Sequence, residues 1–214
     1  MPSLKSLTTF SHPVSLLIWL ILQLLILLIP VTQLPLSEEF TRPAEKLAIE
    51  EMLVAQIALS ALLAPILLPT AASVLVIAAA TWPFLQLAGV LSSTPPYHVI
   101  ESAGFVSIWI ISLGLLVAET SSIRWRMWCF AIASTISIGG AIAAYLRLEF
   151  STGEANPRLF GPIVGALDVV QGSENRLSAW IFLIALLILS ATLRFSFVKL
   201  QRRFSQQVIH SFGG

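Results

Sequence analysis

Two adjacent carboxylic acids, Glu50 and Glu51, stand near the start of a long apolar run and are the most obvious groups for chemistry. A carboxylate held inside a membrane is costly and commonly marks a proton or ion pathway. The following segment, Met52–Leu68, would form a helix about 25 Å long at 1.5 Å per residue. That length nearly crosses a hydrocarbon core of about 30 Å, so both acids would also fit at the headgroup level, where Lys46 can pair with Glu50. Both interpretations stay open.

Two polar residues lie deeper in the same run. Gln56 and Ser60 are four residues apart and therefore share one helix face. Polar side chains inside membrane helices usually hydrogen-bond to a neighbouring helix, although this pair could instead line a substrate path. Pro65 in this run and Pro83 in the next would kink their helices and free carbonyl groups for neighbours. Such kinks suit either a gate or ordinary packing.

The remaining groups with chemical potential lie outside the apolar runs. His98 and Glu101 are three residues apart and would share a face of one helical turn, but no third metal ligand is evident. Asp168 lies in Pro157–Gly172, which is too apolar for a free loop and too short to cross a membrane. Pro162 can open a short helix there. We expect an amphipathic or partly re-entrant helix that covers the end of a path, docks a partner or adheres to the membrane surface.

The composition indicates where these groups must be held. Of 214 residues, 57% are hydrophobic and 11% are charged, against about 25% charged residues in soluble domains. The mean hydropathy is +0.89, so most side chains must face lipid or other membrane helices. The net charge of +1 gives no case for binding nucleic acid. The single cysteine, Cys129, excludes an internal disulfide and a cysteine metal cluster, and the sequence predicts no cofactor and no metal site.

Six apolar segments approach the 20 or so residues that a membrane crossing needs. They are residues 14–31, 47–68, 71–92, 102–118, 127–146 and 177–193. Thr70 is a predicted N-cap between the second and third segments. The sequence therefore predicts an all-α integral membrane protein. We expect a bundle of about six transmembrane helices over residues 14–198, between a short N-terminal segment (1–13) and a basic tail (199–214).

Basic residues near the ends of the six segments predict the orientation. With six crossings both termini share one side, which carries seven of the twelve lysines and arginines, against five on the other side. Ten of the eleven acids fall opposite the termini, and only Glu119 falls on their side. We therefore predict cytoplasmic termini, in a protein of the bacterial inner membrane.

Small residues recur at helical spacing in the fifth segment, and they are Ala133, Ser137, Gly140, Ala141 and Ala144. Small side chains at this spacing let two helix backbones approach closely. The pattern predicts a helix at the centre of the bundle or at a subunit interface.

Three functions remain open. The chain lacks G-x-S-x-G, H-E-x-x-H and G-x-x-x-x-G-K-[ST] motifs, so a self-contained ATPase or familiar hydrolase is not indicated. The first hypothesis is a permease-type subunit of a transport system, energised by a separate protein such as a cytoplasmic ATPase. The second is a structural or assembly subunit, with other membrane subunits or further copies of itself as partners within the lipid bilayer. The third is a membrane enzyme for lipid-linked substrates.

Overall fold

The computed structural model describes residues 12–32, 48–118, 122–150 and 161–212, leaving aside the side chains of 12, 30–32, 123, 143–150 and 200–212. This part of the chain is helical and contains no strand. In order, the helices are α1 (His12–Thr32), α2 (Ala48–Leu67), α3 (Ala71–Leu91), α4 (Pro96–Val117), α5 (Ile123–Phe150), α6 (Pro162–Val170) and α7 (Arg176–Phe212).

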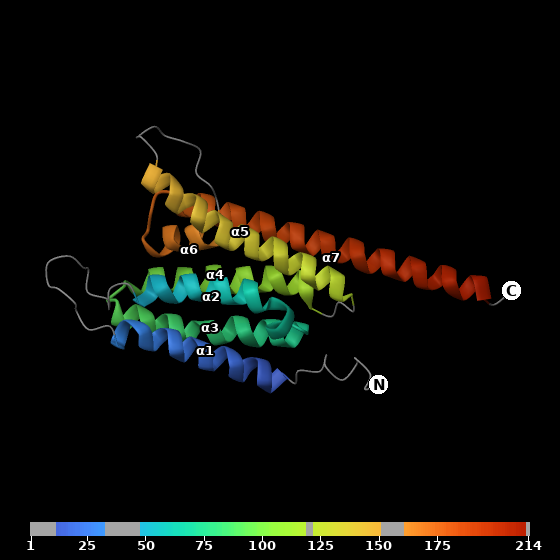
Figure 1. The fold of residues 1–214 in the computed structure, drawn as a ribbon, viewed down its shortest axis with the longest axis horizontal. Coiled ribbons are helices and arrows are strands. Elements are labelled where there is room, and N and C mark those ends of the chain that lie inside the picture. Colours follow the sequence, from blue (N-terminus) through green and yellow to red (C-terminus); the bar gives the residue numbers. More distant parts are fainter. Residues whose placement is uncertain (1–11, 33–47, 119–121, 151–160, 213–214) are drawn as a thin grey trace.

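The six longer helices lie side by side along one axis, and the short α6 lies at one end of the bundle (Figure 1). We call the end with α6 the cap end. The opposite end, where the turn Pro69–Thr70 joins α2 to α3, is the hairpin end. α7 runs from the cap end and continues past the rest of the bundle at the hairpin end (Figure 1).

In the part of the chain that the structure describes, four helices are long and apolar enough to cross a membrane: α2, α3, α4 and residues Arg176–Lys199 of α7. Pro13–Ile29 of α1 is apolar but shorter. An unpaired backbone amide in lipid costs several kcal/mol, so helices that satisfy their own amides are the natural solution for this composition. The fold is therefore an all-helical bundle suited to integral membrane insertion.

The hairpin turn is held by a reciprocal cap, which confirms the predicted role of Thr70. The amide of Ser73 donates to Thr70 Oγ1 at 3.2 Å, and the amide of Thr70 donates to Ser73 Oγ at 3.0 Å. Each side chain thus satisfies an amide that the helix leaves without a partner. A turn of this kind lets two apolar helices run antiparallel with almost no connecting chain.

Several helices extend beyond the apolar segments that predicted them. α4 begins at Pro96 instead of residue 102. Proline is well suited to the first helical position, because an N–H there would have no partner within the helix and proline has none. α5 begins at Ile123 and ends at Phe150, and α7 continues through most of the predicted basic tail. Hydropathy marks only the part of a helix that lies in the hydrocarbon, so polar turns at its ends escape this signal.

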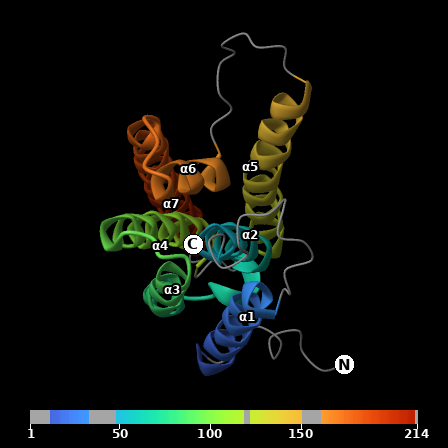
Figure 2. The same ribbon diagram turned by 90° about the vertical axis from the view of Figure 1, so that its left-hand side faces the viewer.

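α2 is the central helix, with α1, α3, α4, α5 and α6 all packed against it (Figure 2). Its side chains Met52, Leu53 and Ile57 are fully buried. α3 and α4 approach each other closely at two glycines. A Cβ on Gly89 would lie 2.5 Å from Val99 Cγ2, and one on Gly114 would collide with Val74. Glycine at these crossings lets the two backbones meet.

Candidate functional site

A buried polar cluster ties the first three helices together at Gln56. Its Nε2 donates to Gln23 Oε1 on α1 at 2.9 Å and to the backbone carbonyl of Thr81 on α3 at 3.4 Å. All three residues are fully buried. One atom of each carboxamide, Gln23 Nε2 and Gln56 Oε1, has no hydrogen-bond partner. Gln56 thus links helices, the commoner role of a polar side chain in a membrane bundle.

Trp109 on α4 extends this cluster to the fourth helix. Its Nε1 donates to Ser60 Oγ at 3.0 Å, and Ser60 in turn donates to the carbonyl of Ile57 at 2.9 Å. Both Trp109 and Ser60 are buried. Since an indole N–H left unpaired in the bundle would carry the cost of its desolvation, this contact fixes the orientation of the ring.

At the cap end, two of the predicted acidic residues, Glu50 and Asp168, each accept a hydrogen bond. Gln171 Nε2 donates to Glu50 Oε1 at 3.1 Å, which links the end of α6 to α2. Ser173 Oγ donates to Asp168 Oδ1 at 2.7 Å, within the turn that follows α6. Glu51 is half-buried and has no hydrogen-bond partner among the described residues. These groups hold the short helix in place.

Glu101 and His98 belong to the same end but do not bond to each other. Trp180 Nε1 on α7 donates to Glu101 Oε1 at 3.0 Å. The ring of His98 lies against Gly172, whose φ of +64° is readily adopted only by glycine. Within the described ranges, no group of three or more His, Cys, Asp or Glu residues is arranged to hold a metal ion.

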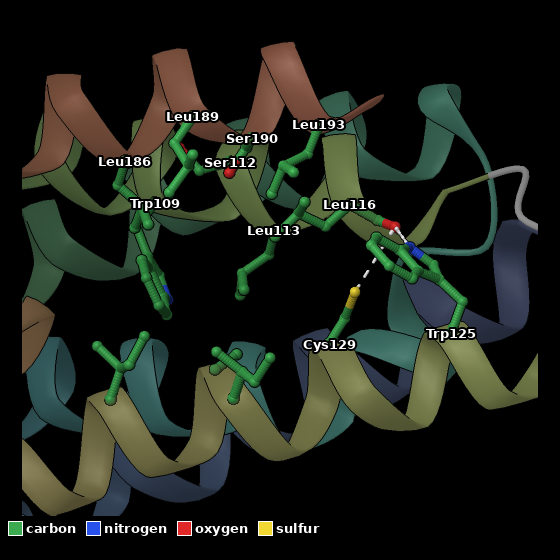
Figure 3. Close-up of a pocket in the computed structure, with 13 residues that line it drawn as sticks. Trp109, Ser112, Leu113, Leu116, Trp125, Cys129, Leu186, Leu189, Ser190 and Leu193 are labelled. Carbon is green, nitrogen blue, oxygen red and sulfur yellow. Dashed lines mark hydrogen bonds between the residues drawn. The ribbon is translucent and has the colours of Figure 1, made fainter. Parts of the chain in front are cut away.

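A cavity lies elsewhere, between α4, α5 and α7 in the half of the bundle nearer the hairpin end. Its volume is about 150 Å³. Figure 3 shows Trp109, Leu113 and Leu116 of α4 between the facing helices α5 and α7. The other walls include Ile132 and Ala133 of α5 and Leu186 and Leu189 of α7. Trp109 therefore separates the buried polar cluster from an apolar cavity.

Two aromatic rings and the short helix α6 lie towards the two ends of the cavity. At the hairpin end the rings of Trp125 and Phe197 stack, with centroids 5.4 Å apart. Towards the cap end, α6 packs against both α5 and α7. Ile132 and Leu189 both line the cavity, yet they are 55% and 54% exposed. The opening therefore lies between α5 and α7, on the surface that lipid would cover.

The chain matches no protein-family model, and no similar curated protein or solved structure was found. The chemistry of the cavity must therefore be read from its own walls. The lining residues that carry a polar side-chain atom are Ser112, Ser190, Trp109, Trp125 and Cys129. Among the described residues, no acid, histidine, lysine or arginine lines it. Such walls suit an apolar ligand and provide no general acid or base.

The residues predicted as a substrate path do not line this cavity. Gln56 and Ser60 lie on α2, on the other side of Trp109 from the cavity. Glu50 and Glu51 on α2 and Asp168 on α6 lie at the cap end, and neither helix contributes a residue to the cavity wall. The small residues of α5 are more mixed. Ala133 lines the cavity, and Ser137 is buried. Gly140 lies against Gly161, and Ala141 packs against the core. The side chain of Ala144 is not among those that the structure describes.

Sequence reasoning missed three residues of these two sites, and each had a signal. Gln23 is a carboxamide in the middle of an apolar run, which calls for a polar partner on another helix. Ser190 is likewise an isolated hydroxyl in the last run. Trp109 gave the weakest signal, because a tryptophan in an apolar helix is ordinarily a packing residue or an interface anchor.

Proposed function

We propose that this chain is a permease-type membrane subunit of a transport system, and that its substrate is a lipid-like molecule with an apolar chain. The observation that supports this proposal is the apolar cavity that opens sideways between α5 and α7. A soluble substrate would need a polar path from one end of the bundle. A molecule dissolved in the bilayer can instead enter from the side.

The size of the cavity sets how much of the substrate it holds. A dry apolar cavity of about 150 Å³ accommodates a molecule as large as benzene. The cavity here therefore holds one end of a chain, while the remainder stays in the bilayer. Moving a CH₂ group from water into the cavity is favourable by about 0.8 kcal/mol. Moving it from the bilayer into the cavity changes the free energy little, because lipid tails are equally apolar. Entry and exit can then both be easy, as transport requires.

The proposal includes six membrane crossings, by α1 to α5 and α7, with α6 at the non-cytoplasmic surface. It also includes cytoplasmic termini in a bacterial inner membrane. The support is the alternating direction of successive long helices (Figure 1). Basic side chains also collect at the hairpin end, where Arg124, Arg126, Arg194 and Lys199 lie.

A photoreactive lipid tests the cavity. Reconstituted protein is irradiated with a phosphatidylcholine whose acyl chain carries a diazirine, and the labelled peptides are identified by mass spectrometry. We expect label on 129–136 and 186–193, the facing walls of the cavity. Label spread evenly over every lipid-facing helix would contradict lateral entry.

The energising partner is a separate part of the proposal, since no nucleotide-binding motif is present. Affinity purification from native membranes should co-isolate an ATPase. If it instead yields only other membrane subunits, whose levels fall when this chain is deleted, the chain is a structural or assembly subunit. The hydrogen bonds that join α1 to α4 through Gln56 and Ser60 favour that second function, because they make those four helices one packed unit.

A further inference from the structure

A buried hydroxyl inside the cavity has no partner. Serine and threonine in membrane helices ordinarily bond to a carbonyl in the preceding turn. Ser112 Oγ does so with Ile108 O at 2.8 Å, and Thr192 Oγ1 with Ile188 O at 2.8 Å. Ser190 is 1% exposed and lines the cavity, and its Oγ bonds to nothing in the described chain. The hydroxyls of Ser102, Ser134 and Ser137 are also buried without a partner among the described residues, but of these four serines only Ser190 lines the cavity. A ligand in the cavity could therefore accept a hydrogen bond from it.

Two arginines lie beside cavity walls at the hairpin end, Arg126 next to Trp125 and Arg194 next to Leu193. Arg126 precedes the wall residue Cys129 by three positions and so lies on the same face of α5. Its side chain is partly buried, and its Nε has no hydrogen-bond partner among the described residues. On α7, Arg194 follows Ser190 by four positions and donates to the carbonyl of Ala118, at the end of α4. Arg194 thus places a second positive charge one helical turn from Ser190.

The spacing of these groups matches one kind of molecule. Four residues of helix separate Ser190 from Arg194, which is about 6 Å along the axis. In a glycerophospholipid, the ester groups lie a few bonds deeper than the phosphate, and the acyl chain lies deeper again. From these contacts we infer that the cavity binds a glycerophospholipid with an anionic headgroup. Its phosphate binds Arg126, an ester oxygen accepts from Ser190, and the first part of one chain fills the cavity. This inference rests on the proposed function.

Competition between two lipids tests the inference. Full-length protein in detergent is incubated with equal amounts of phosphatidylglycerol and phosphatidylcholine, and the bound lipids are counted by native mass spectrometry. We expect phosphatidylglycerol to be preferred about five-fold, the ratio given by one favourable arginine contact near a membrane surface. Arg126→Gln should weaken binding of both lipids, since both carry the phosphate. It should also bring the ratio close to one, because the net negative charge of phosphatidylglycerol then has no arginine to favour it there.

The matched control is Arg124→Gln, because Arg124 is exposed on the same helix and carries the same charge. It should keep the preference, and a loss equal to that of Arg126→Gln would show general surface charge only and overturn the inference. Ser190→Ala should weaken binding of both lipids without changing their ratio, and an unchanged affinity would overturn the assigned ester contact. Excess inorganic phosphate should not displace the lipid.

Two failures are distinguishable. If lipid binds in the cavity but the two headgroups compete equally, the anionic assignment is wrong and the proposed function stands. If no lipid is retained, or if Leu189→Trp, which obstructs the opening, retains as much lipid as the wild type, the proposed function itself fails.

Discussion

Trp109 joins the two internal features of the bundle, because its ring forms a wall of the cavity while its nitrogen bonds into the buried polar cluster. The indole can keep this orientation only while Ser60 accepts from it. Ser60 therefore shapes the cavity without touching it. The sequence left two roles open for Ser60, helix packing and the lining of a substrate path. The hydrogen bond from Trp109 supports the packing role directly. It supports the path only indirectly, because Ser60 orients the ring that lines the cavity.

A double-mutant cycle measures this contact. Ser60→Ala leaves the buried indole N–H unpaired and should cost about 1–3 kcal/mol of unfolding free energy. Once Trp109→Phe has removed the donor, Ser60→Ala should cost less, by about 0.6–1.7 kcal/mol, the range of interhelical hydrogen bonds in membrane proteins. Unfolding in mixed micelles provides the four free energies.

Ser112→Ala is the control for that cycle, since the Ser112 hydroxyl bonds to a carbonyl of its own helix. Its effect should be small and should add to that of Trp109→Phe. Strictly additive losses for Ser60→Ala and Trp109→Phe would show that the hydrogen bond contributes nothing measurable.

The helix pair α3 and α4 forms a rigid side of the bundle through backbone approach and hydrogen bonds. Besides the two glycine contacts, Trp82 Nε1 on α3 donates to Ser107 Oγ on α4 at 2.9 Å, and Ser107 donates back to the carbonyl of Ala78 at 3.3 Å. These bonds lie within two turns of Pro83, where the α3 ladder lacks one amide. Since α4 also forms the cavity wall that faces α5 and α7, we expect this wall to be rigid.

Gly114→Ala tests the close approach of these two helices. The added methyl would collide with Val74, so we expect a loss of about 1–3 kcal/mol, typical of overpacking. Gly104→Ala on the same helix is the matched control, because a Cβ there would meet its nearest neighbour, Trp180, at an ordinary 3.7 Å. Thermal denaturation in detergent compares the two, and equal stability would contradict the close packing of α3 on α4.

The helices were largely predictable from the sequence, but the cavity between them was not. Apolar runs between Pro, Gly and charged breaks gave the long helices, and Pro162 gave the start of α6, because these signals are local. The cavity depends on α5 and α7 failing to pack along their length, and no local pattern expresses that. The sequence indicates that Gln23 needs a polar partner on another helix. It does not indicate that this partner is Gln56, 33 residues away on α2.

For the molecule as a whole, orientation is the property with the widest consequences, because it decides which leaflet the proposed headgroup site faces. In a Cys129→Ala background, cysteine replaces exposed Glu174 at the cap end or exposed Lys199 on α7. A membrane-impermeant maleimide should label Glu174→Cys in intact cells and Lys199→Cys only after permeabilisation. Labelling in the reverse order would overturn the cytoplasmic termini, and labelling of both in intact cells would overturn the crossing of α7.

The lateral opening is the central claim, and two neighbouring residues on α7 allow a direct test. Leu189 lines the cavity and Ile188 does not, although the two are similarly exposed, at 54% and 61%. Photo-crosslinking with the diazirine phosphatidylcholine is repeated on Leu189→Trp and Ile188→Trp. Leu189→Trp should lower label on 129–136 at least about ten-fold, as a loss of about 1.4 kcal/mol would, while Ile188→Trp should leave it unchanged. Equal labelling in the two variants would show that lipid does not enter the cavity between α5 and α7.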